Sequence, residues 1–227
     1  MGLVALVGGN EFRRESDPLD LALLARAGGP GVAVAILPTG ATNENPEVVG
    51  ENGIRHFTRL GAAPEKLLVV DADSANDPTL AAAIAAHAVI YITGGDPAYI
   101  LETLGGSLAW QAVLAVHQRG GLVAGSSAGA MLLGEQMWRF DGWTPGLNLA
   151  PGLAVLPHHA TLSKRWAVSH MRAALPPGVT LVGIDEATAL LLPEARVLGA
   201  GHVTLYGTAG AAVFGAGAQV PLKGLLA

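Results

Sequence analysis

Short apolar runs rich in β-branched residues alternate along this chain with longer Ala- and Leu-rich stretches. The runs have the length of strands, and Gly or Pro separates many of them from the stretches that follow. This alternation is typical of a mostly parallel sheet with helices on both faces, so we predict a three-layer α/β fold. The expected strands cover residues 3–7, 32–37, 67–70, 88–93, 121–124, 154–156, 179–183 and 188–192.

The Ala- and Leu-rich stretches predict helices over residues 17–27, 48–60, 79–86, 97–104, 108–119, 128–136 and 163–174. Asp17-Pro18 and Asp96-Pro97 each pair a capping carboxylate with Pro at the first helical position. Beyond residue 187, short runs broken by Gly predict a short antiparallel edge near the C-terminus. Residues 141–151 look like a loop that covers the active site. Composition does not shift along residues 1–227, so we expect a single domain.

Composition removes several classes of function. The net charge of −5 comes from scattered residues without any Lys/Arg run, so nucleic acid is not an expected partner. The chain has no Cys, which excludes disulfides, thiolate metal sites and Cys nucleophiles. Its start lacks the basic segment of a signal peptide, and its longest apolar run, residues 80–92, is shorter than the roughly 20 residues that span a bilayer. We expect a cytoplasmic protein without a membrane partner.

The strongest motif is Gly125-Ser126-Ser127-Ala128-Gly129, which joins an expected strand to an expected helix. It fits Gly-x-Ser-x-Gly, the sharp turn that presents a serine nucleophile, and its spacing selects Ser127. Gly125 and Gly129 let strand and helix approach closely while the serine hydroxyl stays accessible. The same sequence pattern also occurs in flexible Gly/Ser loops and in anion-binding turns. The flanking strand and helix favour the nucleophile.

Two groups of backbone N–H donors are candidates for an oxyanion hole. The N–H of Ala128 begins the helix after the motif, where the helix dipole favours negative charge. Another strand ends in Thr93-Gly94-Gly95-Asp96-Pro97, whose glycines free the N–H groups of Gly95 and Asp96 to face a neighbouring pocket. No P-loop or Gly-x-Gly-x-x-Gly follows, which argues against a nucleotide site. A plain turn with Asp96 as helix cap is compatible with either role.

A serine nucleophile needs a general base. His158 and His159 follow a short strand, at a place where strand ends gather, and either one is a candidate. Asp185 and Glu186 end another strand and are candidates for the acid that orients the base, with a solvated turn as the alternative. A metal site needs further ligands at suitable spacing, and the sequence has no such cluster. We therefore expect no metal and no cofactor.

Six segments along the chain occur in the order typical of a known family. They are Gly8-Gly9-Asn10-Glu11, Leu37-Pro38-Thr39, Thr93-Gly94-Gly95-Asp96, Gly125-Ser126-Ser127-Ala128-Gly129-Ala130, Pro157-His158 and Gly183-Ile184-Asp185-Glu186. With them the chain resembles peptidase family S51, which includes aspartyl dipeptidase (peptidase E) and cyanophycinase. The resemblance spans nearly the whole chain and implies a fold like that of class I glutamine amidotransferases. Because those amidotransferases carry Cys at the elbow, their activity is not expected here.

The resemblance implies a serine peptidase that works through an acyl-enzyme without a cofactor. The implied roles are nucleophile for Ser127, general base for His158, orienting acid for Glu186, and oxyanion donors for Ala128, Gly95 and Asp96. The implied substrate is a small peptide, possibly a dipeptide with N-terminal Asp, because aspartyl dipeptidases share Pro157-His158. His159 is a candidate for substrate binding. The cations that follow the base, Lys164, Arg165 or Arg172, are candidates to bind a substrate carboxylate, with a solvated helix face as the alternative.

Three alternatives stay open. A cyanophycinase-like enzyme would cleave β-aspartyl peptides, but cyanophycinases have Gln where this chain has Pro97, and Asp-Gln before the base where this chain has Leu156-Pro157. An α/β-hydrolase esterase would use Ser127, then Asp185 or Glu194, then His202. A non-catalytic member would bind a ligand and keep only the fold. Ala-rich helical faces are also compatible with a homodimer.

Overall fold

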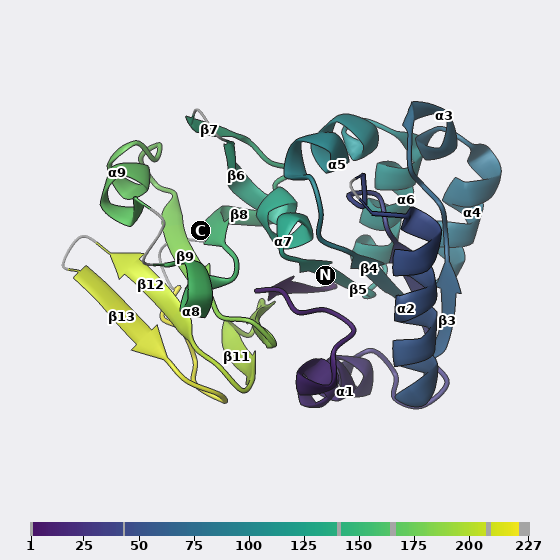
Figure 1. Ribbon diagram of the computed structural model, residues 1–227, viewed down its shortest axis with the longest axis horizontal. Helices are drawn as coiled ribbons and strands as arrows, with labels where there is room; N and C mark the ends of the chain where they lie inside the picture. The colour runs from purple at the N-terminus through teal and green to yellow at the C-terminus, as the bar shows by residue number, and fades with distance from the viewer. Residues whose placement is uncertain (1, 43, 140–141, 164–166, 208–209, 223–227) are drawn as a thin grey trace.

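The computed structural model describes residues 2–42, 44–139, 142–163, 167–207 and 210–222. Within them the chain forms two β-sheets that lie side by side, with helices packed around the larger one (Figure 1). The predicted α/β class is confirmed. The strands divide between two sheets, however, whereas the sequence pattern indicated one sheet with a short antiparallel edge.

The larger sheet has seven strands in the order β11-β10-β1-β5-β4-β2-β3. Their bounds are β1 (Leu3–Val7), β2 (Ala33–Leu37), β3 (Ala63–Lys66), β4 (Val89–Ile92), β5 (Leu122–Ser126), β10 (Thr188–Leu192) and β11 (Arg196–Gly199). The five neighbouring strands β1, β5, β4, β2 and β3 are parallel. Strands β10 and β11 continue the sheet in antiparallel pairing. Strands β4 and β5 are buried along their full length, which explains why they are continuous apolar runs in the sequence.

Helices cover both faces of this sheet. Helices α1 (Asp17–Arg26) and α2 (Pro46–Arg59) pack on one face, where Leu19, Leu23 and Phe57 join a core cluster with Val34 and Tyr91. The opposite face carries α4 (Pro78–Ala86), α5 (Pro97–Leu104), α6 (Leu108–Gln118) and α7 (Ala128–Leu133). The short elements η1 (Arg14–Ser16) and α3 (Ala72–Ala75) precede α1 and α4. This arrangement brings the ends of β1, β4 and β5 to one edge.

The smaller sheet has six strands in the order β13-β12-β9-β8-β6-β7. Their bounds are β6 (Gly134–Arg139), β7 (Gly142–Pro145), β8 (Ala150–Leu156), β9 (Thr180–Ile184), β12 (Val203–Gly207) and β13 (Gly210–Phe214). Strands β6, β8 and β9 run parallel, and the other pairs are antiparallel. Two short helices, α8 (His159–Leu162) and α9 (Val168–Ala173), follow β8. Met171 of α9 packs on Leu156 and Leu181.

Several predicted elements are wrong in position. The third strand is residues 63–66 and not 67–70, because 63–66 pair with β2 at the sheet edge. The expected helix 128–136 ends at residue 133, where Gly134 turns extended and β6 begins. The expected loop 141–151 instead contributes β7 and the start of β8; Trp143 packs edge-on against Trp138 of β6 and donates its Nε1–H to the Met171 carbonyl at 2.7 Å. These pairings join residues that the local sequence pattern does not connect.

Among the described residues, no single helix has the length and apolar composition to cross a membrane, and α5 and α6 meet that test only as a pair bent by 89°.

Candidate active site

Ser127 lies on the turn between β5 and α7 with φ 52° and ψ −113°, backbone angles that a non-Gly residue rarely adopts. Its N–H donates to the Val7 carbonyl at 2.9 Å, so β1 holds the turn in place. A Cβ on Gly125 would lie 2.4 Å from the Gly129 carbonyl oxygen, and one on Gly129 would lie 2.6 Å from the Ile92 carbonyl oxygen. Only glycines allow this close crossing of strand and helix, as the motif predicts.

His158 faces the serine from the end of β8. Its Nε2 lies 2.9 Å from Ser127 Oγ, within hydrogen-bonding distance. His158 adopts the left-handed conformation, with φ 50° and ψ 37°, and its N–H donates to the Gly8 carbonyl at 2.7 Å. A Cβ on Gly9 would lie only 2.2 Å from the His158 ring. The Gly8-Gly9 pair after β1 therefore lets the two sheets approach closely enough for the imidazole to reach the serine.

Glu186 lies behind the imidazole, two residues after β9. Its Oε1 is 3.5 Å from His158 Nδ1, within ion-pair range but longer than a close hydrogen bond. Thr161 of α8 donates its hydroxyl proton to the same oxygen. The Ala187 N–H donates to the Gly9 carbonyl at 3.0 Å, which ties this turn to β1 as well. The structure thus places His158 between Ser127 and Glu186, with one ring nitrogen near each.

The second histidine of the pair points elsewhere. His159 Nε2 lies 2.7 Å from the Tyr206 hydroxyl, and its Nδ1 lies 3.4 Å from Asp185 Oδ1. A Cβ on Gly183 would overlap the His159 ring, so the ring packs against β9. The left-handed conformation of His158 sends these adjacent side chains to different places. These contacts of the His159 ring with Tyr206 and Asp185 argue against the expected role of His159 in substrate binding.

Asp185 and His202 form a separate contact. Asp185 Oδ2 accepts the backbone N–H of His202 at 2.9 Å and lies 3.3 Å from His202 Nδ1. The His202 side chain is 57% exposed. The ring nitrogen within reach of Ser127 belongs to His158. This arrangement argues against the esterase order that would place His202 as the base.

The expected oxyanion donors differ in their bonding. The Asp96 N–H already donates to the Gly40 carbonyl at 2.9 Å, which argues against its expected role as an oxyanion donor. The Asp96 side chain instead caps α5 by accepting the N–H groups of Ala98 and Tyr99, as the Asp-Pro pair indicated. Within the described part of the chain, the N–H groups of Gly95 and Ala128 have no hydrogen-bond acceptor. These two remain as donors that a substrate oxygen could meet.

Asp17 does not cap α1 through its side chain, although the sequence predicted it. The N-cap residue is Ser16. The Asp17 carboxylate instead forms a bidentate ion pair with Arg59 of α2, in which Nη1 and Nη2 donate to Oδ2 and Oδ1 at 2.5 and 2.6 Å. This contact with the Arg59 guanidinium holds the pKa of Asp17 below its ordinary value. The ion pair joins α1 to α2.

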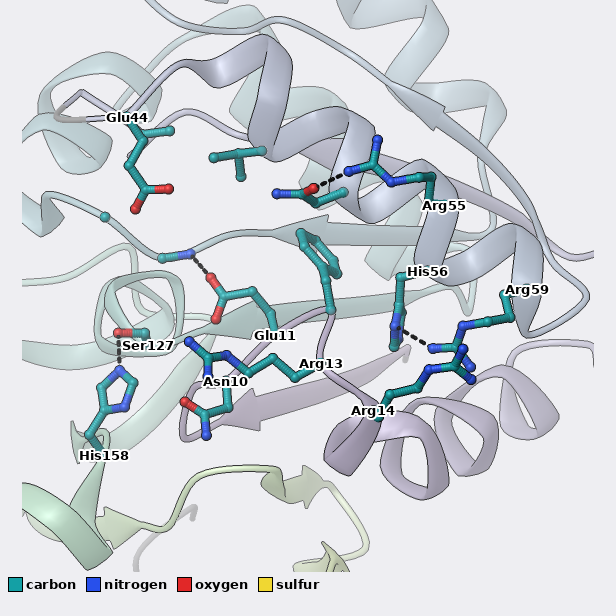
Figure 2. A pocket seen from close by; sticks show the side chains of 16 residues that line it. Asn10, Glu11, Arg13, Arg14, Glu44, Arg55, His56, Arg59, Ser127 and His158 are labelled. Carbon is teal, nitrogen blue, oxygen red and sulfur yellow. Dashed lines mark hydrogen bonds between the residues drawn. The ribbon is translucent and has the colours of Figure 1, made fainter.

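A cavity of about 630 Å³ opens beside Ser127 and His158. The remaining lining comes mainly from the segment after β1, from the stretch that ends in α2, and from the Gly94-Gly95 turn. Figure 2 shows Ser127 and His158 at one end of the cavity and the guanidinium groups of Arg55 and Arg59 towards the other. A pocket of this size suits a small molecule with charged groups.

The described lining of this cavity contains cations that the sequence analysis did not propose. Lys164 and Arg165 lie outside the described residues. The described cations of the cavity come from earlier in the chain and are Arg13, Arg14, Arg55 and Arg59. Sequence reasoning missed them because the resemblance directed attention to the residues after the base. Among the described residues, no group of three or more His, Cys, Asp or Glu side chains could hold a metal ion.

Comparison with known proteins identifies the family of the chain. The family model described as peptidase family S51 matches residues 3–198. The chain belongs to peptidase family S51. It is 25% identical over 185 residues to an uncharacterised peptidase of Listeria innocua, with 74% of this chain and 84% of the relative covered. The fold and the membership predicted from the sequence motifs are confirmed, and the protein is a peptidase.

Two solved structures are similar to this S51 chain. A peptidase from an acI-B1 actinobacterium superposes with a TM-score of 0.87 at 28% identity, covering 97% of this chain and 96% of that one. A putative peptidase E from Listeria monocytogenes superposes with a TM-score of 0.64 at 18% identity, covering 95% and 98%. The second likeness concerns the fold alone.

The S51 site contains an acid to which sequence reasoning gave no role. Glu11 lines the cavity; its Oε1 accepts the Gly94 N–H at 2.9 Å and its Oε2 accepts the Ser126 hydroxyl at 2.8 Å. Glu11 therefore joins the two turns that flank the nucleophile. The sequence feature that could have pointed to Glu11 is its place in Gly8-Gly9-Asn10-Glu11, directly after the first strand.

The wall of the S51 cavity also contains a buried acid–histidine pair. His56 Nε2 lies 2.7 Å from Asp20 Oδ2, and both side chains are 1% exposed. Burial raises the pKa of Asp20, and the contact with His56 opposes this shift. The pair adds a second contact between α1 and α2, beside that of Asp17 with Arg59.

Proposed function

We propose that this S51 peptidase cleaves small peptides, foremost dipeptides with N-terminal Asp, through Ser127, His158 and Glu186. The observation that carries the proposal is the 2.9 Å contact between Ser127 Oγ and His158 Nε2 on a strained strand-to-helix turn. Serine is a weak nucleophile unless an adjacent base accepts its proton. A base within hydrogen-bonding distance, with a carboxylate behind it, meets that requirement.

The chemistry proceeds in two halves. Ser127 Oγ attacks the peptide carbonyl carbon while its proton moves to His158 Nε2, and the N–H groups of Ala128 and Gly95 donate to the new oxyanion. The C–N bond then breaks as His158 returns the proton to the leaving amine. Water attacks the acyl-enzyme by the same route and releases the acid and Ser127. Glu186 keeps the imidazole oriented and stabilises its positive charge throughout.

The charges of the cavity support an acidic substrate. In Figure 2 the Arg13 side chain extends towards the end of the cavity that holds Ser127. Arg13 makes no ion pair with any acid in the described part of the chain, whereas Arg59 is bound to Asp17. An Arg guanidinium in this position can bind a carboxylate with two parallel hydrogen bonds. An Asp side chain next to the scissile bond meets this requirement.

Mass spectrometry of the intact protein after treatment with a fluorophosphonate tests the nucleophile. We expect one adduct on the wild type, no adduct on Ser127→Ala, and labelling of His158→Ala slowed at least about 100-fold, because general-base assistance is lost. Circular dichroism of each variant serves as the folding control. Equal labelling of wild type and Ser127→Ala, or no labelling by several probes, would overturn the proposed mechanism.

Substitution of Arg13 tests the acidic specificity. Arg13→Gln should lower kcat/KM for Asp-Leu about 10- to 100-fold, since a charged hydrogen bond contributes about 1.5–3 kcal/mol. The value for Ala-Leu should change less than about threefold. The matched control is Arg26→Gln, which removes the same charge from an arginine near Glu194 and away from the cavity. A parallel loss on both dipeptides would contradict a role in carboxylate recognition.

A further inference from the structure

Glu11 places a negative charge beside the nucleophile. A Cβ built on Gly94 would lie 3.0 Å from Glu11 Oε1 and 3.5 Å from Ser127 Oγ. The carboxylate and the serine oxygen are therefore both within 3.5 Å of one point next to Gly94. The Glu11 side chain lines the same cavity as Ser127 and His158, as Figure 2 shows. The carboxylate is therefore close enough to the serine for one small ligand to contact both.

This charge has no counter-ion in the described part of the chain. No Lys, Arg or His nitrogen there lies within 4.0 Å of the Glu11 carboxylate. The two donors that it accepts, the Gly94 N–H and the Ser126 hydroxyl, are neutral. Attack by Ser127 creates a second negative charge on the substrate oxygen, and two like charges at short range in a cavity repel each other. A cation brought by the substrate would remove this penalty.

We propose that Glu11 binds the α-ammonium group of the residue whose carbonyl Ser127 attacks, so that the enzyme requires a free N-terminus. This inference rests on the proposed peptidase mechanism at Ser127. The α-nitrogen and the scissile carbonyl carbon are bonded to the same Cα, so attack by Ser127 brings the ammonium group close to the serine. Each carboxylate oxygen of Glu11 accepts one hydrogen bond from the protein and keeps a further lone pair for the ammonium protons.

The opposite charges along the cavity then fix the direction of the substrate. The carboxylate of Glu11 binds the ammonium group at the nucleophile, and the arginines bind the carboxylates of the same small peptide. A peptide with additional residues before the scissile bond lacks an ammonium group at this position and leaves Glu11 without a partner. The specificity for a terminal residue thus arises from the desolvation of one unpaired carboxylate.

Binding to an inactive enzyme tests this role without turnover. The two probes are Asp-Leu and succinyl-leucine, which differ only in the α-ammonium group, and calorimetry measures their Kd for Ser127→Ala. We expect Asp-Leu to bind at least about 10-fold more tightly. The double variant Ser127→Ala/Glu11→Gln should lose this difference, because Asp-Leu binds more weakly while succinyl-leucine binds equally or more tightly. Gln keeps one oxygen that can accept the Gly94 N–H.

Other outcomes separate the possible failures. An equal loss for both probes in the double variant would show that Glu11 only holds the two turns together, and equal binding of both probes to Ser127→Ala would also overturn the ammonium role. The fluorophosphonate reaction of the wild type gives an independent readout of the peptidase mechanism, since it needs Ser127 and His158 but no ammonium group. Absence of labelling in the wild type would instead count against the peptidase mechanism.

Discussion

His158→Ala should lower kcat/KM for Asp-Leu by about 10⁴-fold or more, because the serine then loses the only ring nitrogen that the described structure places within hydrogen-bonding distance of its hydroxyl. Residual catalysis would come from the backbone donors and from binding. The loss should appear in kcat, since His158 acts on the reacting atoms. Steady-state kinetics with purified protein measures both parameters.

The matched control for this prediction is His202→Ala. His202 also lies beside a carboxylate, that of Asp185, but its side chain is 57% exposed and does not line the cavity. We expect kcat/KM to stay within about threefold of wild type. The reverse result, an active His158→Ala and an inactive His202→Ala, would support the esterase order of catalytic residues and refute the proposed one.

Gly9→Ala should lower activity about 10³-fold or more while the protein still folds. The new methyl group would lie 2.2 Å from His158 Cε1 and 2.7 Å from both ring nitrogens. The ring must move away, and its 2.9 Å contact with Ser127 is then lost. Gly9 also has φ 117°, where a side chain strains the backbone, so we expect about 1–3 kcal/mol of destabilisation. Urea unfolding measures the stability, and dipeptide hydrolysis measures the activity.

Gly28→Ala separates the two causes. Gly28 has φ 130°, comparable backbone strain, but the nearest atom to its added Cβ would be Val32 Cγ2 at 3.7 Å, an ordinary contact. This variant should lose similar stability and keep its activity within about twofold. If Gly9→Ala proved as active as Gly28→Ala, the close packing of Gly9 on the catalytic imidazole would have no functional role.

Much of the fold could be predicted from local sequence patterns. The strands 89–92 and 122–126 are buried on both faces, and burial on both faces produces continuous apolar runs that are easily identified. Helix α5 begins and ends where predicted, since Asp96 caps it and Gly105 ends it. Strand β6 was missed because Glu, Gln and Met within it also suit a helix, and its pairing with β7 and β8 decides the outcome.

The nucleophile could be identified from the sequence because its elbow is a local device. The five residues 125–129 contain the turn, the small neighbours and the first oxyanion donor, so their spacing alone selects Ser127. The choice between His158 and His159 was different. Adjacent residues in a chain have the same local surroundings, and the resemblance to a family, not the residues themselves, favoured His158.

The sequence by itself determined the α/β class, the elbow and the strand ends that carry the reactive groups, because each depends on the periodicity and backbone demands of a few neighbouring residues. Tertiary structure alone decided that the site joins two sheets, that His158 turns towards Ser127 while His159 turns to Tyr206, and that Glu11 bonds the turns beside the nucleophile. Each of these contacts joins residues far apart in the chain. Packing of the whole molecule sets such distances, and no local pattern encodes them.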